Sequence, residues 1–130
     1  ITKLARVVYE TKDFGFQVLC GSAGFLLPSL NAGCAGGVCA SANVLGPETC
    51  HLYEMFKSNR AAEARELQAR MVVPNNMVTK MITRGLGVPA LKHMMDVYGF
   101  YGGLPRAPLI KLSQQQAASV ETAFKTYGFT

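Results

Sequence analysis

Two short apolar runs limit what this 130-residue chain can fold into more than any other feature of its sequence. The first covers residues 16–20, the second covers residues 38–42, and a segment with helical character lies between them. Continuous apolar runs of this length are typical of strands that are covered on both faces in a parallel sheet. Two such strands joined through a helix form a βαβ crossover, so the pattern predicts parallel strands in a protein of the α/β class.

The rest of the sequence predicts helices. Apolar residues recur at helical spacing, and proline, glycine and capping residues mark the ends of the segments. Ser113 and Gln116 form a capping box at the start of the last segment, and we expect Asn59 to cap a helix that begins at residue 60. The expected helices lie near residues 2–12, 24–31, 47–57, 60–82, 90–98 and 114–127.

Two strands alone cannot enclose a hydrophobic core, because the strands of a parallel sheet need cover on both faces. We therefore expect the chain to be part of a larger α/β sheet or barrel, completed by sequence upstream or by a partner. The first residue is Ile rather than Met, and no apolar or Arg-rich leader follows it. We expect a chain that is processed, cut or incomplete at its N-terminus, with any targeting segment outside it.

The charge distribution and the length of the apolar runs disfavour two classes of partner. The formal net charge is +5, only 16% of the residues are charged, and the basic residues are scattered along the chain. Nucleic-acid binding needs a focused basic patch, so we expect no nucleic-acid partner. No apolar run approaches the roughly 20 residues that span a bilayer, so we expect no membrane partner either.

The four cysteines do not show metal-ligand spacing. Cys20, Cys34, Cys39 and Cys50 form no C-x-x-C pair, and the two histidines are far apart in the sequence. Cys20 and Cys39 lie in apolar runs, where a free cysteine packs as a small buried side chain. We therefore expect free thiols, a reducing compartment and no metal.

Two segments carry a resemblance to a known family. Residues 16–25, FQVLCGSAGF, and residues 33–44, GCAGGVCASANV, resemble the last two strands of the dihydrodipicolinate synthase and N-acetylneuraminate lyase superfamily. Residues 87–92 and 102–109 resemble its C-terminal region. The matches follow the order of the superfamily and cover nearly the whole chain.

The resemblance implies a (β/α)8 TIM barrel followed by a small helical region. Residues 1–58 would be the C-terminal part of the barrel, with its last two strands and helices, and residues 59–130 would be the C-terminal helical region. In such barrels the active site lies at the C-terminal ends of the strands.

Members of this superfamily are class I aldolases, in which a lysine amine forms a Schiff base with the ketone of a pyruvate unit and a tyrosine moves the proton. The match is nearest to the animal mitochondrial branch, which cleaves 4-hydroxy-2-oxoglutarate to pyruvate and glyoxylate. The resemblance places the lysine shortly before Ile1 and the tyrosine further upstream, so we expect no catalytic residue in this chain. It implies a small keto-acid substrate, no cofactor, a homotetramer and the mitochondrial matrix.

Four residues are assigned to the substrate site by the resemblance. Gly21 matches a glycine that lets the backbone approach the bound keto acid, and Val38 matches a branched residue that backs the pyruvyl methyl group. Ser22 and Ser41 are candidates for polar contacts. A turn that needs positive φ explains Gly21 equally well, and barrel-core packing explains Val38 equally well.

The sequence leaves alternatives to the aldolase function, and it bears on the class of substrate. Sialic-acid lyases carry an acidic pair after the glycine, where this chain has Ala23 and Gly24, and an apolar wall leaves sugar hydroxyls unpaired. We therefore expect a small keto acid rather than a sugar acid. The alternatives are a dihydrodipicolinate synthase-like enzyme, a non-catalytic barrel fragment that only binds or scaffolds, and an unrelated helical interaction module.

Overall fold

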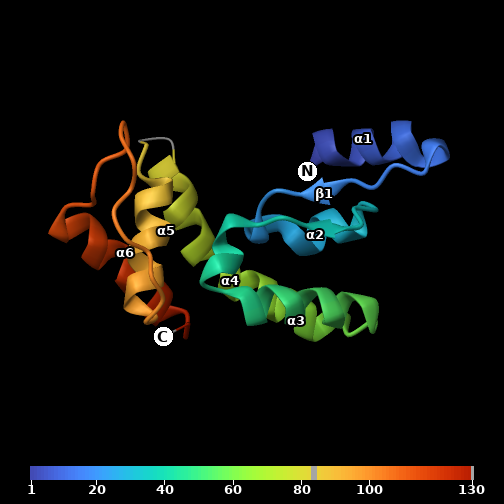
Figure 1. The fold of residues 1–130 in the computed structure, drawn as a ribbon. Coiled ribbons are helices and arrows are strands. Elements are labelled where there is room, and N and C mark those ends of the chain that lie inside the picture. Colours follow the sequence, from blue (N-terminus) through green and yellow to red (C-terminus); the bar gives the residue numbers. More distant parts are fainter. Residues whose placement is uncertain (83–84, 130) are drawn as a thin grey trace.

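The structure, a computed structural model, describes residues 1–82 and 85–129, and for residues 79–82 it describes the backbone alone. A helix comes first along the chain, a βαβ unit follows it, and further helices make up the rest (Figure 1). The elements up to residue 58 are α1 (Thr2–Thr11), η1 (Lys12–Phe14), β1 (Leu19–Cys20), η2 (Ala23–Phe25), α2 (Leu26–Asn31), β2 (Gly36–Gly37), η3 (Ala40–Asn43) and α3 (Gly46–Lys57), where η marks a 3-10 helix. The later elements are α4 (Ala61–Ile82), α5 (Gly87–Val97) and α6 (Gln114–Thr126).

The two strands pair directly and run parallel, as the sequence predicts. Cys20 lies opposite Gly37, and the amide of Val38 donates to the carbonyl of Cys20 at 2.8 Å. At the other end, the amide of Ala35 donates to the carbonyl of Val18 at 2.9 Å. The βαβ crossover is therefore confirmed, with α2 as its helix.

The predicted strands are too long, and the second one is misplaced. Residues 38–42 do not form a strand, because β2 precedes them and η3 begins within them. The carbonyl of Ser41 accepts from the amides of Val44 and Leu45 at 3.0 and 2.8 Å, and these bonds close a turn there. Phe16 lies outside β1 and is 63% exposed. Within the described residues each strand has one hydrogen-bonding neighbour, so pairing covers only the residues that face each other.

The six predicted helices are present, and their ends differ from the prediction by at most three residues. Ser113 starts α6 in the expected capping box: its hydroxyl accepts from the amide of Gln116 at 3.3 Å, and its amide donates to Gln116 Oε1 at 2.9 Å. The prediction that Asn59 caps the start of α4 is wrong. Asn59 has φ 58°, in the left-handed region, and the amide of Arg60 donates to the carbonyl of Met55 at 2.9 Å, so this turn ends α3 instead.

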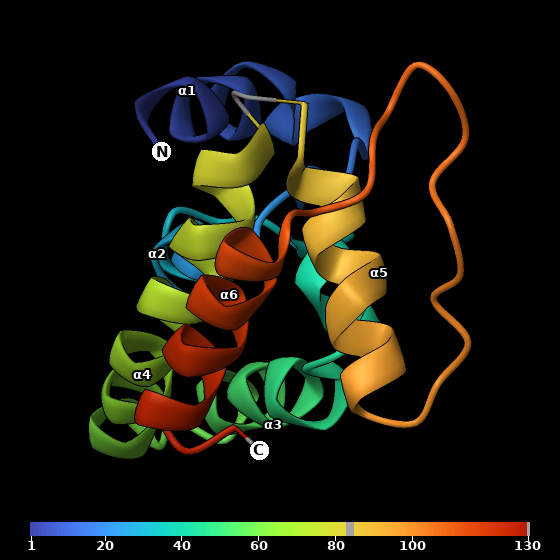
Figure 2. The same cartoon turned by 90° about the vertical axis from the view of Figure 1, so that its left-hand side faces the viewer.

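Helix α4 joins the two halves of the chain. It contacts η2 and α3, which precede residue 58 or end at it, and it contacts α5 and α6, which follow it. Figure 2 shows α4 beside α6. Ala64, Met71 and Pro74 on this helix are all fully buried. Most of the buried apolar residues form one continuous core that draws side chains from both halves. The division into residues 1–58 and 59–130 accordingly stays a proposal about the parent fold.

The C-terminal residues are fixed to the helices by contacts of Tyr98 and Arg70. The Tyr98 ring meets the Phe124 ring edge-on, with centroids 6.3 Å apart, and the Tyr98 hydroxyl donates to the carbonyl of Phe129. Arg70 Nη2 on α4 donates to the carbonyl of Tyr127 at 3.1 Å. Residues 98–113 connect α5 to α6 and extend to one side of the helices (Figure 2). None of the described helices is both long and apolar enough to cross a membrane.

Candidate functional site at the strand ends

The C-terminal ends of β1 and β2 lie side by side and present Gly21 and Val38. Because Cys20 pairs with Gly37, Gly21 and Val38 are the residues that follow on the two strands. Both are exposed, and Val38 exposes 73% of its surface. A Cβ built at Gly21 would meet no atom within 4 Å. The strand ends are therefore an open surface in this chain.

A turn with positive φ does not explain Gly21, whereas packing in the core of a complete barrel stays open for Val38. Gly21 is not one of the glycines with positive φ, so its backbone does not require glycine. Val38 is exposed, so packing against this chain does not account for its branched side chain. These two residues are suited to contact something outside the chain, either neighbouring barrel strands or a ligand.

Ser22 and Ser41 are linked through Asn75 on α4, which is not one of the predicted site residues. Ser41 Oγ donates to Asn75 Oδ1 at 3.0 Å, and Asn75 Nδ2 donates to Ser22 Oγ at 3.1 Å. Ser22 Oγ also accepts from the amide of Gly24 at 3.3 Å. Ser41 is 2% exposed and Asn75 is 7% exposed, whereas Ser22 is half-buried. The α4 amide thus bridges the two turns that follow the strands.

A second side-chain amide on α4, that of Gln68, binds backbone groups in the segment that follows β1. Gln68 Oε1 accepts from the amide of Leu27 at 2.8 Å, and Gln68 Nε2 donates to the carbonyl of Ala23 at 2.9 Å. Gln68 is 7% exposed. Buried amides whose donors and acceptors are satisfied in this way fix the position of the groups they bind. Helix α4 therefore sets the position of the turn after β1.

The sequence does contain a signal for these two amides. Gln68 and Asn75 share a helix face with Ala64, Met71 and Val78, which are all buried, so two polar residues interrupt an apolar stripe. Buried polar side chains need hydrogen-bond partners, and the partners of a core-facing amide lie on other elements. The pattern indicates an interior network but not its partners, which lie 34 to 53 residues away along the chain.

Three of the four cysteines lie in or near the two strands. Cys20, Cys34 and Cys39 are buried, as expected for the first and third, and Cys50 is exposed; all four are free. Burial, followed by the neighbouring Cys20 thiol, raises the pKa of Cys39 to about 11. Burial likewise raises the pKa of Cys34. Among the described residues, no three His, Cys, Asp or Glu side chains gather as metal ligands would.

These thiols are expected to differ in reactivity. In the native protein, iodoacetamide should modify Cys50 and leave Cys39 unmodified, because a buried thiol with a raised pKa offers little thiolate. Peptide mass spectrometry after brief labelling measures this, with the denatured chain as the control in which every thiol reacts. Equal rates at Cys39 and Cys50 would contradict the buried position.

The pKa of the Cys39 thiol also makes stability depend on pH. This pKa is near the ordinary cysteine value of 9.0 in the unfolded chain and about 11 in the folded chain, so the contribution of Cys39 to stability is lost as pH rises through that interval.

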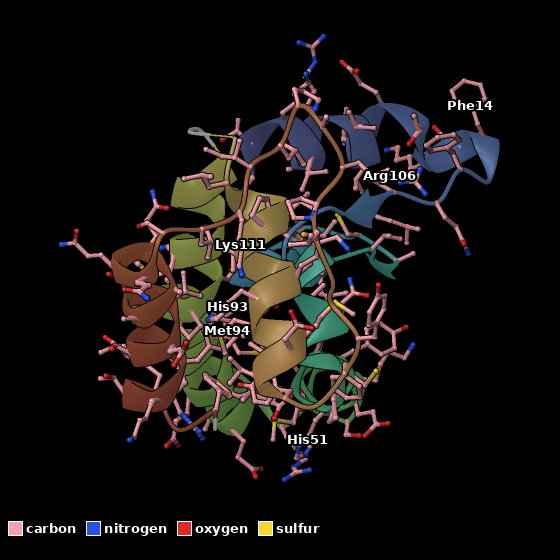
Figure 3. The ribbon with its side chains drawn as sticks, turned by 60° about the vertical axis from the view of Figure 1, so that its left-hand side comes forward. Phe14, His51, His93, Met94, Arg106 and Lys111 are labelled. Carbon is pink, nitrogen blue, oxygen red and sulfur yellow. The ribbon has the colours of Figure 1, made fainter. Side chains whose placement is uncertain are left out.

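A cavity of about 360 Å³ lies elsewhere, between α5, the 98–113 connection and α6. Its lining includes His93, Asp96 and Lys111, and Figure 3 shows His93 and Lys111 from these elements. His93 Nε2 lies 2.7 Å from Glu121 Oε1, and Asp96 Oδ1 accepts from the amide of Gly102 at 2.8 Å. The first contact joins α5 to α6, and the second holds the connection against α5. No residue of the strand ends lines this cavity.

Two lysines of this chain, Lys92 and Lys12, contact groups away from the strand ends. The Lys92 ammonium on α5 donates to the carbonyl of Gly102. The Lys12 ammonium lies 4.5 Å from the centre of the Tyr9 ring. Neither residue belongs to the turns that follow β1 and β2.

A parallel βαβ unit with polar residues at the C-terminal strand ends, and with helices packed against it, occurs in TIM barrels and in open α/β sheets. The model of the family described as "Dihydrodipicolinate synthetase family" matches residues 1–127. The chain belongs to this family and corresponds to the C-terminal part of its barrel.

Relatives of this chain include enzymes with different substrates. It is 30% identical over 122 residues to a protein of Emericella nidulans named as a probable mitochondrial 4-hydroxy-2-oxoglutarate aldolase, covering 94% of this chain and 38% of that protein. It is 35% identical over 115 residues to the N-acetylneuraminate lyase of Rattus norvegicus, covering 88% of this chain and 35% of that enzyme.

Solved structures confirm the fold. A crystal structure of a Thermus thermophilus protein described as a "putative dihydrodipicolinate synthase" superposes with a TM-score of 0.78 at 29% identity. The match covers 97% of this chain and 44% of that chain. The chain therefore spans less than half the length of the relatives that it matches.

Proposed function

We propose that this chain forms the C-terminal wall of the active site of a Schiff-base aldolase that acts on a pyruvate-containing keto acid. The observation that carries the proposal is the gathering of Gly21, Val38, Ser22 and Ser41 at the C-terminal ends of β1 and β2, in a member of a family of lyases and synthases. That edge is where TIM barrels hold their substrates. The family membership supports the class of reaction, and the chain supplies the wall.

The chemistry needs a lysine amine that forms a Schiff base with the substrate ketone, and the protonated imine then accepts the electrons of the C–C bond as it breaks. We propose that this lysine and the proton-transferring tyrosine precede Ile1 in a longer protein. Within the present chain, Gly21 leaves room for the keto acid because it has no side chain. Val38 presents its exposed methyl groups at the same edge, where they contact the pyruvyl methyl group.

We propose 4-hydroxy-2-oxoglutarate as the substrate, cleaved to pyruvate and glyoxylate. The resemblance to the Emericella nidulans protein supports this choice. The turn after β1 also supports it, because Ala23 is fully buried and a Cβ at Gly24 would lie 3.1 Å from Asn75 Cγ. The Asn75 amide thus fills the space that a side chain at position 24 needs. Ala23 and Gly24 offer no acidic side chain to bind the hydroxyls of a sugar acid, which would be left unpaired.

We further propose that the longer protein is a mitochondrial homo-oligomer, a tetramer by resemblance. The name of the Emericella nidulans relative supports the location. Exposed apolar side chains support the completion of the barrel by further strands: Phe16 is 63% exposed, Leu19 is 49% exposed and Phe14 is 81% exposed. Phe14 points away from the rest of the chain in Figure 3. Apolar surface of this extent is normally covered.

The substrate is tested on the longer protein, meaning this chain preceded by the strands and the lysine that complete the barrel. Pyruvate release from 4-hydroxy-2-oxoglutarate and from N-acetylneuraminate is followed with lactate dehydrogenase and NADH. We expect release from the first compound and not from the second. Preferred cleavage of N-acetylneuraminate would refute the substrate, and condensation of pyruvate with aspartate semialdehyde would favour the synthase alternative. No reaction and no binding of pyruvate would favour a scaffold.

A further inference from the structure

The hydrogen bonds between Ser41, Asn75 and Ser22 have a direction. The Asn75 carbonyl oxygen can only accept a hydrogen bond, so Ser41 donates its hydroxyl proton to it. Asn75 Nδ2 and the amide of Gly24 both donate to Ser22 Oγ, and they fill the two acceptor positions of that oxygen. The hydroxyl proton of Ser22 therefore points away from both, and no acceptor for it occurs among the described residues.

Ser22 is placed where this proton can reach a ligand. It follows Gly21 at the open end of β1 and is half-buried, whereas Ser41 is buried at 2% exposure. We infer that Ser22 binds the substrate as a hydrogen-bond donor to one of its oxygens, and that Asn75 is the positioning residue that turns the Ser22 hydroxyl toward the substrate. Ser41 holds Asn75 in register and does not touch the substrate. This inference rests on the proposed function.

The ligand chemistry follows from the direction of the bonds. A hydroxyl whose lone pairs are both filled can only donate, so the group that it recognises is an acceptor: a carboxylate, a keto oxygen or the lone pair of a hydroxyl. A keto acid with a second carboxylate or hydroxyl offers such oxygens. An ammonium group at the same place would find no acceptor on Ser22. The network thus selects for an oxygen acceptor.

Asn75→Asp in the longer protein tests the direction. A carboxylate has no N–H to donate, so Ser22 must give its proton to the new carboxylate or lose that contact, and the proton is withdrawn from the substrate. Ser22→Ala removes the same proton outright. We expect each variant to raise the KM for the best-cleaved keto acid about 10- to 100-fold, the value of one hydrogen bond to a charged or strongly polar group. Turnover should change much less.

The two changes act on one proton, so the double variant Ser22→Ala with Asn75→Asp should raise KM no more than Ser22→Ala alone. Gln68→Glu is the matched control, because it makes the same amide-to-carboxylate change on the same helix and removes a donor to a backbone carbonyl of that turn. It should lower the unfolding midpoint in urea without the KM rise. Asn75→Leu serves as a second variant that removes the amide donor without adding a charge, and it should raise KM as Asn75→Asp does.

The outcomes separate this inference from the function on which it rests. Wild-type protein that is not trapped by pyruvate and borohydride overturns the proposed function, and the inference with it. Wild-type protein that is trapped, together with unchanged KM in Ser22→Ala, overturns the inference alone. Additive losses in the double variant, or an equal KM rise in Gln68→Glu, would show that Asn75 acts only on the fold of the turn.

Discussion

Replacing Gly21 with Val in the longer protein should abolish the trapping of pyruvate by borohydride. A Cβ at this position meets no atom of the chain within 4 Å, and the backbone is not left-handed, so the change does little to folding. The added isopropyl group instead occupies the surface across which the keto acid reaches the amine. Displacing a reacting group by about 1 Å costs about 100-fold in rate, and we expect at least that loss in the rate of trapping.

Lys92→Ala is the matched control for this experiment. Lys92 donates to the carbonyl of Gly102 and not to any group at the strand ends, so its loss should leave trapping unchanged. A thermal melt of Gly21→Val checks that the variant folds. Normal trapping by Gly21→Val would show that the substrate does not pass the end of β1, and the site would have to be placed elsewhere.

The largest loss of stability from a single methyl group is expected at Gly102. A Cβ there would overlap the carbonyl of Lys92, with Lys92 C at 2.7 Å, and this atom belongs to the backbone of α5 and cannot rotate away. Gly102 is also buried, and its amide donates to Asp96 Oδ1 at 2.8 Å, so the connection is held at this point. We expect Gly102→Ala to lower the free energy of unfolding by about 3 kcal/mol through displaced backbone and a lost hydrogen bond.

Urea denaturation of the longer protein measures this loss, with Gly46→Ala as control. A Cβ at Gly46 meets nothing within 4 Å and lies at the start of α3, where alanine is favoured over glycine. Its midpoint should stay the same or rise slightly. A midpoint for Gly102→Ala within error of the wild type would mean that the 98–113 connection moves freely over α5.

Local sequence patterns predict the helices of this chain well. The capping box at Ser113 and Gln116 depends only on residues three apart, so the sequence reports it directly. The prediction of a strand at 38–42 is wrong because an apolar run says that a segment is covered, not which residues pair. Pairing here follows from the register of Cys20 with Gly37, and the small residues after it close a 3-10 turn instead. The error at Asn59 has a similar cause, since Asn suits both the start of a helix and a left-handed residue at its end.

The sequence predicts the positions of the candidate site and not its connections. Gly21 and Val38 come from a resemblance at the ends of the predicted strands, and the structure places them at adjoining positions. The role of Asn75 depends on contacts with Ser22 and Ser41, which lie 53 and 34 residues away. Tertiary packing decides such contacts, and no local pattern encodes them. The interruption of the apolar stripe on α4 is the only trace of them in the sequence.

If this chain forms a wall of the aldolase site, the nucleophilic lysine lies before Ile1. Borohydride trapping of the longer protein with pyruvate, followed by peptide mass mapping, tests it most directly. We expect one lysine upstream of Ile1 to carry the reduced pyruvate adduct, and every lysine of residues 1–130 to remain unmodified. An adduct on Lys3, Lys12, Lys92 or any other lysine of this chain would contradict the account.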